Sequence, residues 1–169
     1  MNSKHLMSEV ELDATVERLK ARFLYQFHEA NGGYSVDPGW LPIFTRLCEG
    51  VDQALSKKSK SFFYWVQWKE KFGSLRAYFE GGPTYVDFFG IDGHHHLEVP
   101  TATNAGIDDV EAKQIQNLVH AAETESARTC MFCGAPGRRR TDQPWIVTAC
   151  DGCANTRRCS SDEDDGSGS

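Results

Sequence analysis

The sequence predicts an α+β fold in which about three helices pack on a small antiparallel β-sheet, followed by a small cysteine-rich module. Three observations predict this class. Apolar residues recur every three or four positions in three segments, aromatic residues enrich an alternating segment between the second and third of these, and two cysteine pairs follow the last one. We therefore divide the chain into a body (1–127), a module (128–159) and an acidic tail (160–169).

The first helix is predicted from residue 9 to about residue 30. Ser8 and Glu11 form the S-x-x-E pattern of a capping box in front of it, and the sequence N-G-G at 31–33 favours its end. Its apolar face is interpreted as a core-packing face and consists of Leu12, Val16, Leu19, Phe23 and Phe27.

Two further helices are predicted from the same spacing. The second runs from about residue 40 to 56, because Pro42 suits a first helical turn and apolar residues follow it at helical intervals. The third runs from 108 to about 127, with Asp108 or Asp109 as its N-terminal cap. It leads directly into the first cysteine pair, so we expect no free linker between the body and the module.

A β-hairpin is predicted between the second and third helices. Residues 62–68 and 75–79 have the two-residue period of strands, and F-G-S at 72–74 supplies the turn. Residues 85–89 are predicted to add a third strand. Strict alternation places Val66, Trp68, Leu75, Ala77 and Phe79 on the inner face and Gln67, Lys69, Arg76 and Tyr78 on the outer face.

Two C-x-x-C pairs carry the strongest signal for a bound metal. They are Cys130 with Cys133 and Cys150 with Cys153, separated by the sixteen residues 134–149. This spacing is typical of a structural zinc site, in which four thiolates surround the ion at about 2.3 Å each. Because four thiolates leave no position for water or substrate, the pattern predicts one structural rather than catalytic Zn²⁺.

Other roles of the cysteines are weighed against zinc. The polar first ten residues give no signal peptide, which favours a cytoplasmic, reducing setting over disulfides. A redox role would need one pair within a thioredoxin-like pattern, which the sequence lacks. Cys159 is a possible substitute ligand at an unusual spacing and is interpreted as a free thiol, and Cys48 as a small core residue.

Charge is divided unevenly along the chain. Residues 1–127 carry 12 Lys or Arg and 18 Asp or Glu, a net charge of −6. Residues 128–159 carry 6 Arg and 2 Asp, a net charge of +4, and the tail carries −4. A basic module therefore lies between an acidic body and an acidic tail. No apolar run reaches the ~18 residues that a membrane span requires, which predicts a protein without a membrane partner.

Within the module, R-R-R at 138–140 is predicted as a turn and residues 145–149 as a strand that enters the second cysteine pair. Residues 154–158 are predicted as a short helix, which would make the module a treble clef rather than a plain zinc ribbon. The sequence leaves both folds open.

The basic residues of the module suggest a nucleic-acid interface. Guanidinium groups bind phosphate in a planar fork, and an indole ring can stack on a base. Against this hypothesis, the whole chain is acidic and lacks the Cys₂His₂ helix of a finger. The candidate residues are Arg138, Arg139, Arg140, Trp145, Arg157 and Arg158.

A run of three histidines, His94 to His96, follows Asp87 and Asp92. Such a group can hold a catalytic metal or supply the general base of a hydrolase. However, adjacent residues of an extended chain point to opposite faces, so three in a row do not reach one ion without a special loop. We interpret the run as a solvated loop or hairpin tip.

The motifs together resemble those of a known family. The stretches are G-W-L-P-I-F-T-R-L-C (39–48), V-Q-W-K-E-K-F-G-S-L-R-A-Y-F (66–79), A-E-T-E-S-A-R-T-C-M-F-C-G-A-P-G (122–137) and W-I-V-T-A-C-D-G-C-A (145–154). In this order they are similar to a largely uncharacterised family of small bacterial and phage proteins. Its members share a V-x-x-K-E-K-F-G-x-L-R hairpin and a C-terminal C-x-x-C-G-x-P-G zinc motif. The resemblance implies a protein of a phage or mobile element and supplies no catalytic residue, and the histidine run and acidic tail are not part of it.

The leading functional hypothesis is a cytoplasmic, non-enzymatic zinc-containing binding protein. It would bind, and by binding inhibit or adapt, a host protein in a phage or prophage setting. A nucleic-acid-binding zinc protein that uses the arginines is the alternative, and a hydrolase that uses the histidines with Asp92 comes third. The tail is predicted to be disordered, and its final G-S-G-S resembles a linker scar.

Overall fold

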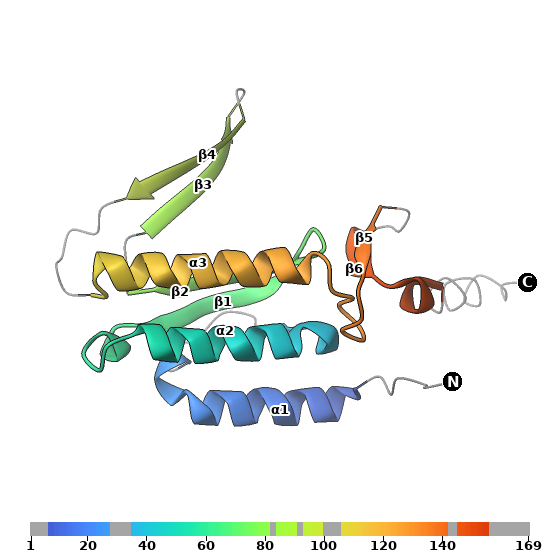
Figure 1. The fold of residues 1–169 in the computed structure, drawn as a ribbon, viewed down its shortest axis with the longest axis horizontal. Helices are drawn as coiled ribbons and strands as arrows, with labels where there is room; N and C mark the ends of the chain where they lie inside the picture. Colours follow the sequence, from blue (N-terminus) through green and yellow to red (C-terminus); the bar gives the residue numbers. More distant parts are fainter. Residues whose placement is uncertain are drawn as a thin grey trace, which may run out of the picture.

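The computed structural model describes residues 7–27, 35–81, 84–90, 93–99, 106–141 and 145–155, with backbone only for 84–90 and 93–99. The fold is α+β, as predicted. Helices α1 (Glu9–Arg22), α2 (Leu41–Ala54) and α3 (Asp109–Ser126) lie side by side, and the hairpin of β1 (Tyr64–Lys71) and β2 (Ser74–Glu80) lies behind α2 and α3 (Figure 1). None of the helices in these ranges has the length and apolar composition needed to cross a membrane.

Helix α1 begins as predicted but ends about eight residues earlier than the predicted end. The capping box is present, since the Ser8 side chain accepts from the Glu11 N–H and the Glu11 carboxylate accepts from the Ser8 N–H. Phe23 leaves helical geometry, and the short 3-10 helix η1 (Leu24–Gln26) follows. This break buries Gln26, whose amide accepts from Trp65 Nε1 at 3.0 Å and donates to the Cys48 carbonyl at 3.0 Å. The predicted stop at 31–33 lies outside the described residues.

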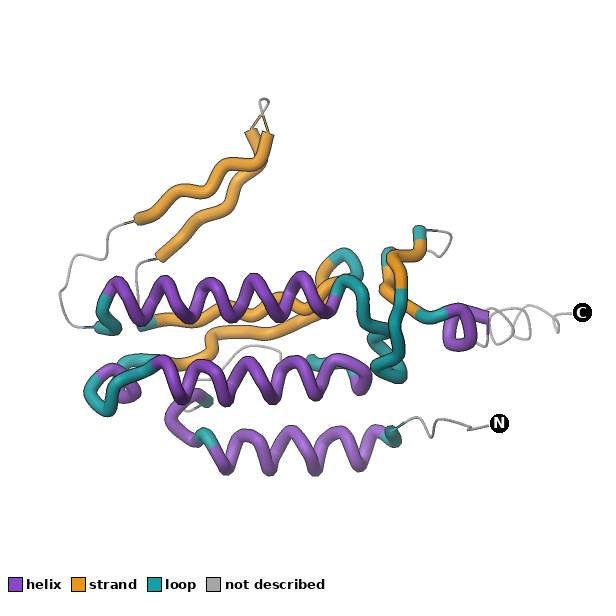
Figure 2. Tube along the Cα trace, viewed as in Figure 1, coloured by secondary structure: helices purple, strands orange, loops and turns teal. Residues whose placement is uncertain are grey.

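Helices α2 and α3 match their predicted positions. Pro42 lies in the first turn of α2, and Asp108 caps α3 by accepting from the N–H groups of Val110 and Glu111. The two helices pack against each other, and α3 also packs on β2 (Figure 2). The C-terminal end of α3 and the N-terminal end of α2 meet at the same end of the molecule, where the cysteine module lies (Figure 1).

The hairpin differs from the prediction in one respect that changes its inner face. The pairing of β1 with β2 shifts between Trp65 and Gln67, so an irregularity of the β-bulge type interrupts strict alternation. Trp65 and Trp68 are therefore both fully buried, whereas Val66 is 36% exposed. Trp68 packs on Phe44 of α2 with ring centroids 4.9 Å apart. The predicted inward position of Val66 is wrong, because the extra residue of the bulge reverses the alternation.

The predicted third strand exists but belongs to a separate hairpin. Strand β3 (Thr84–Gly90) pairs with β4 (Gly93–Val99), and this two-stranded sheet projects away from the body (Figure 2). The outer edge of β2 lies against α3, where the Leu75 N–H donates to Ser126 Oγ at 2.9 Å, so this edge is already occupied near its start.

The histidine run lies in β4, opposite residues 87–89 of β3, rather than in a loop. The prediction that the run lies in a loop is therefore wrong, because the run belongs to a strand. The run does begin directly after the tip of a hairpin, which is the other predicted location. Adjacent strand positions belong to alternating faces of a sheet, so the three consecutive histidine positions do not share one face.

Candidate metal centre

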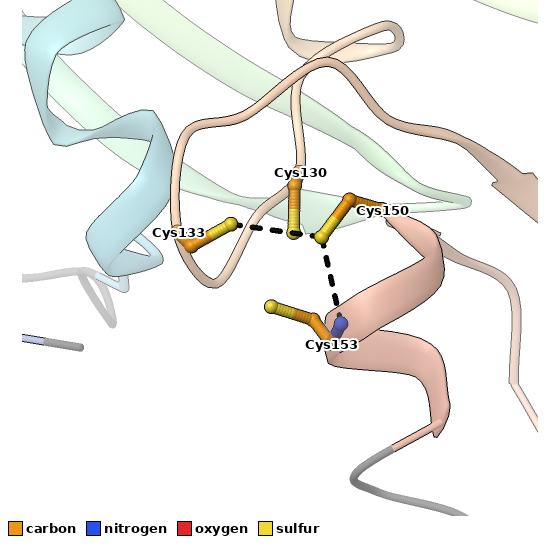
Figure 3. Close-up of side chains that lie close together, drawn as sticks. All are labelled: Cys130, Cys133, Cys150 and Cys153. Atoms are coloured by element: carbon orange, nitrogen blue, oxygen red, sulfur yellow. Dashed lines mark hydrogen bonds between the residues drawn. The ribbon is translucent and has the colours of Figure 1, made fainter. Parts of the chain in front are cut away.

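The first cysteine pair lies in a tight turn directly after α3. The Cys130 N–H donates to the Ala135 carbonyl at 2.7 Å, and the Cys130 carbonyl accepts from the Gly134 N–H at 2.9 Å. These two bonds fold residues 130–135 back on themselves. Both side chains of the pair thereby face the second pair (Figure 3).

The second pair lies at the start of a helical turn. Strand β5 (Arg138–Arg140) pairs with β6 (Val147–Ala149), and β6 leads directly into a helical segment at 151–155. The Ala154 N–H donates to the Cys150 carbonyl at 3.0 Å, and the Cys153 N–H points at Cys150 Sγ at 3.4 Å (Figure 3). The helix begins three residues before the predicted position, so it starts directly after Cys150 and carries Cys153.

The four thiols can hold one metal ion. The sulfur atoms of Cys130, Cys133, Cys150 and Cys153 all lie within 4.8 Å of one another, and all four cysteines are free. Four ligands at about 2.3 Å in a tetrahedron have sulfur atoms about 3.8 Å apart. The measured separation of the Cys133 and Cys150 sulfurs is 3.7 Å. The donor set and its spacing therefore fit a four-thiolate site.

The surroundings of the thiols differ from one ligand to the next. Cys130 is fully buried, and the other three are half-buried. The hydrogen bond from the Cys153 backbone N–H, the largest cause, lowers the pKa of the Cys150 thiol to about 7. Desolvation raises the pKa of Cys133 and that of Cys153. Metal binding to thiolates releases protons, so the affinity of this site for metal falls as the pH is lowered.

The first cysteine turn packs against, and is hydrogen-bonded to, the segment that precedes α2. The Gly39 N–H donates to the Met131 carbonyl at 2.7 Å, and Trp40 Nε1 donates to the Thr129 carbonyl at 2.8 Å. A Cβ atom at Gly39 would lie 2.0 Å from the Cys130 carbonyl oxygen, so only glycine allows this approach.

The module is also fixed to the turn between β1 and β2. Thr148 of β6 is fully buried, and its hydroxyl donates to the Gly73 carbonyl at 2.6 Å. Its own carbonyl accepts from the Met131 N–H at 3.0 Å. Thr148 therefore joins the β1–β2 turn, the first cysteine turn and β6. The buried cluster that contains the tryptophans of the body also includes Met131, Val147, Ala149 and Ala154 of the module.

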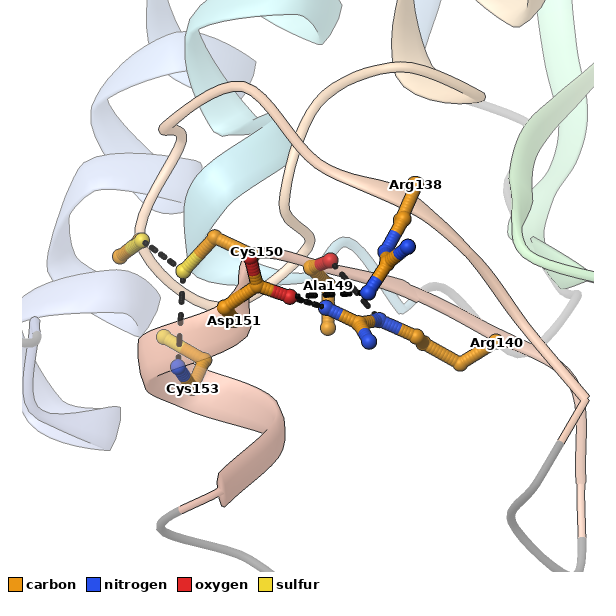
Figure 4. A network of polar contacts seen from close by, with 7 residues as sticks. Arg138, Arg140, Ala149, Cys150, Asp151 and Cys153 are labelled. Atoms are coloured by element: carbon orange, nitrogen blue, oxygen red, sulfur yellow. Dashed lines mark hydrogen bonds and ion pairs between the residues drawn. The ribbon is translucent and has the colours of Figure 1, made fainter.

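The arginine run forms strand β5 rather than the predicted turn. Arg138 and Arg140 both pair with Asp151, the residue after Cys150 (Figure 4). Arg140 Nε also donates to the Ala149 carbonyl at 3.4 Å, and the Arg140 side chain is only 12% exposed. The hydrogen bond from the Arg140 guanidinium is the main cause that holds the pKa of the Asp151 carboxyl below its usual range. Pairing with β6 and the contacts of Arg138 and Arg140 with Asp151 stabilise this strand.

The remaining residues of the predicted nucleic-acid patch are divided. Arg139 is exposed and forms no ion pair with any residue that the structure describes. Trp145 is 67% exposed. Arg157 and Arg158 lie outside the described residues, as does Cys159. Among the described residues of the predicted patch, Arg139 and Trp145 are thus exposed, whereas Arg138 and Arg140 pair with Asp151.

Several residues of this site were not singled out from the sequence. Asp151 stands inside the second C-x-x-C pair, and its partners Arg140 and Arg138 lie 11 and 13 residues earlier, so no local pattern signals the ion pair. Gly39 and Gly73 each stand beside an aromatic residue, and their roles depend on contacts with residues more than 70 positions away, which no local pattern encodes.

Replacement of Arg140 by glutamine is expected to weaken metal binding roughly tenfold. Effects of this size are typical when residues that contact and orient the metal ligands are replaced. Four thiolates and one divalent ion carry a net charge of −2, and Arg140 both positions the loop of Cys150 and adds nearby positive charge. Competition with a chromophoric chelator would measure the affinity. Arg139→Gln is the matched control and should leave it unchanged; equal losses in both variants would contradict a specific role of Arg140.

The chain has no match among protein-family models, curated proteins or solved structures.

Proposed function

We propose that the protein is a non-enzymatic zinc protein that acts by binding another macromolecule. The observation that carries this proposal is the position of the four thiols. They lie where α3, the segment before α2 and the β1–β2 turn meet. An ion at this point would join the two cysteine pairs of the module, and the module in turn bonds to the segment before α2 and to the β1–β2 turn. To hold such a module together is the role of a structural metal.

Zinc is the ion that best suits this site. Four thiolates at tetrahedral spacing favour Zn²⁺ or an iron–sulfur centre, and zinc is the usual occupant of paired C-x-x-C turns in a single small module. The order of a cysteine turn, a β-hairpin and a helix that begins within the second pair supports a treble clef over a plain zinc ribbon. A closed four-thiolate site leaves no coordination position for substrate, which supports a non-enzymatic role.

The partner is proposed to be a macromolecule of a bacterial host, and the setting a phage or other mobile element. The support for this setting is the resemblance of the four sequence motifs to a family of phage and bacterial proteins. The first candidate partner is a host protein that is bound and inhibited. Nucleic acid is the second candidate, and the exposure of Trp145 and Arg139 specifically favours it.

Metal content and partner binding can be tested together. The full chain purified without chelator is expected to contain one Zn²⁺ by elemental analysis. Removal of the ion by a strong chelator should lower the melting temperature and abolish binding to any partner, and added Zn²⁺ should restore both. Protein that contains no metal when freshly purified, and that is equally stable with and without added Zn²⁺, would refute the proposal.

A further inference from the structure

The turn between β1 and β2 presents a bulky aromatic residue in an unfavourable backbone conformation. Phe72 has φ = 53° and Gly73 has φ = 80°, so both central residues of this two-residue turn have positive φ. Such turns favour Asn-Gly, because asparagine tolerates this region far better than phenylalanine. The Phe72 side chain is also 61% exposed. Neither backbone preference nor burial therefore accounts for phenylalanine at this position.

The turn is held rigidly despite this strain. The Gly73 N–H donates to the Glu70 carboxylate at 2.6 Å, and the Gly73 carbonyl accepts from the buried hydroxyl of Thr148. Ser74 Oγ donates to the Lys71 carbonyl at 3.1 Å. Strained residues that are fixed by their surroundings occur most often at binding sites. The cysteine module thus helps to fix the turn that carries Phe72.

The segments that contact the turn carry a second exposed aromatic residue and a cation, and another cation adjoins the turn in the sequence. The Val147 backbone lies next to Gly73, and Trp145 precedes it by two residues. Arg139 pairs with Thr148 across β5 and β6, and opposed residues of antiparallel strands share a face, so Arg139 lies on the face of β5 that is turned toward Gly73. The Lys71 ammonium lies 5.5 Å from the centre of the Phe72 ring.

We infer that Lys71, Phe72, Arg139 and Trp145, here called the tip surface, bind single-stranded nucleic acid. Aromatic rings that stack on bases and cations that contact phosphates are the two components of such sites. Neither Lys71 nor Arg139 is paired with a carboxylate among the residues that the structure describes. Two isolated rings flanked by cations suit stacked bases better than a protein interface, which needs a wider apolar centre. The inference rests on the proposed binding function and favours nucleic acid, the second candidate partner, over a host protein.

The test uses the full chain loaded with one equivalent of Zn²⁺. Fluorescein-labelled oligothymidylate and oligouridylate of about 20 nucleotides, long enough for one such site, are titrated by fluorescence anisotropy. Binding is measured from about 50 to 200 mM salt, because phosphate contacts make affinity depend on salt. We expect both oligonucleotides to bind at low salt, and the affinity to fall steeply as salt is added.

Phe72→Asn and Trp145→Ala are each expected to weaken binding roughly 5- to 150-fold, the range measured for single aromatic stacking contacts. Phe72→Asn should fold at least as well as the original, because asparagine suits the turn, so its loss of affinity cannot result from unfolding. Arg139→Gln should weaken binding and reduce the salt slope by about 0.7. Leu24→Ala and Arg18→Gln, on exposed positions of the N-terminal region, are the controls and should have no effect.

Three results would overturn the inference. Folded, zinc-loaded protein that binds neither oligonucleotide at low salt would do so, and the proposed zinc-dependent binding of another macromolecule would still stand. Unchanged affinity in Phe72→Asn and Trp145→Ala would place any binding elsewhere. Equal affinity for a duplex of the same length would exclude stacking, because paired bases are not accessible to the rings.

Discussion

Replacement of Cys130 by serine is expected to abolish metal binding and to unfold the C-terminal module. The binding free energy of structural Zn²⁺ in small modules is roughly 10–16 kcal/mol, and it is also folding free energy. Cys130 is the fully buried ligand, so its loss leaves a gap at the point where the module meets the body. We expect less than one tenth of the original zinc content by elemental analysis, as well as a lower melting temperature, since such a variant loses several kcal/mol.

Two other cysteines serve as controls for this variant. Cys48 is buried in α2, away from the four thiols, and Cys48→Ala should keep full zinc content even though it loses core packing. Cys159→Ser tests whether the fifth cysteine of the C-terminal region can replace a ligand. A Cys130→Ser protein with full zinc content would contradict the assignment of the ligands, and loss of zinc in Cys159→Ser would add a ligand to it.

Replacement of Gly39 by alanine should destabilise the protein by about 3 kcal/mol or more, at the upper end of the costs of overpacking. The added Cβ would lie 2.0 Å from the Cys130 carbonyl oxygen and 2.5 Å from the Gly134 backbone nitrogen. Both contacts are backbone atoms of the turn that holds two metal ligands, so they cannot move aside without disturbing the site. Urea unfolding and chelator competition would measure the two effects, and metal affinity should fall together with stability.

Gly152→Ala is the matched control for this prediction. Gly152 lies between the second pair of ligands, and a Cβ there would have no atom within 4 Å. Because the residue lies in a helical segment, alanine is expected to be neutral or to stabilise by up to about 1 kcal/mol. If Gly39→Ala is as stable as Gly152→Ala, the close approach of the first cysteine turn to the body is not required for the fold.

Helices and the approximate strands could be predicted because their signals are local. The capping box of α1, Pro42 of α2 and Asp108 of α3 each act within one helical turn. The errors arose where distant contacts decide the structure. Helix α1 ends early at a position that lets Gln26 bond to Trp65, which is 39 residues away. The bulge beside Val66 allows two tryptophans to reach one core, and strict alternation cannot anticipate it.

The same division applies to the candidate metal centre. The ligands could be predicted, since spacing alone brings the two thiols of each pair to one side of a turn. The role of the arginines could not be predicted, because the sequence does not reveal that Arg138 and Arg140 both form ion pairs with Asp151. The tip surface joins residues 71 and 72 of the body with residues 139 and 145 of the module. No pattern in either segment indicates the other.

The bonds that seat the module have a consequence for the order in which the nascent chain can fold. The acceptor of the Trp40 indole N–H lies 89 residues further along the chain, and the donor to the Gly73 carbonyl lies 75 residues further along. Both partners are therefore synthesised later. During synthesis, the three helices and the β1–β2 hairpin can assemble before the module does. In that state the Trp40 N–H has no acceptor, and the surface beside Trp40 is not yet covered by the first cysteine turn. The module cannot fold until its last cysteine pair has left the ribosome, so the aromatic surface around Trp40 stays exposed until then. If the four thiols bind a metal ion as proposed, the ion would favour folding of the module over this surface, and a chain without the ion would expose it to aggregation for longer.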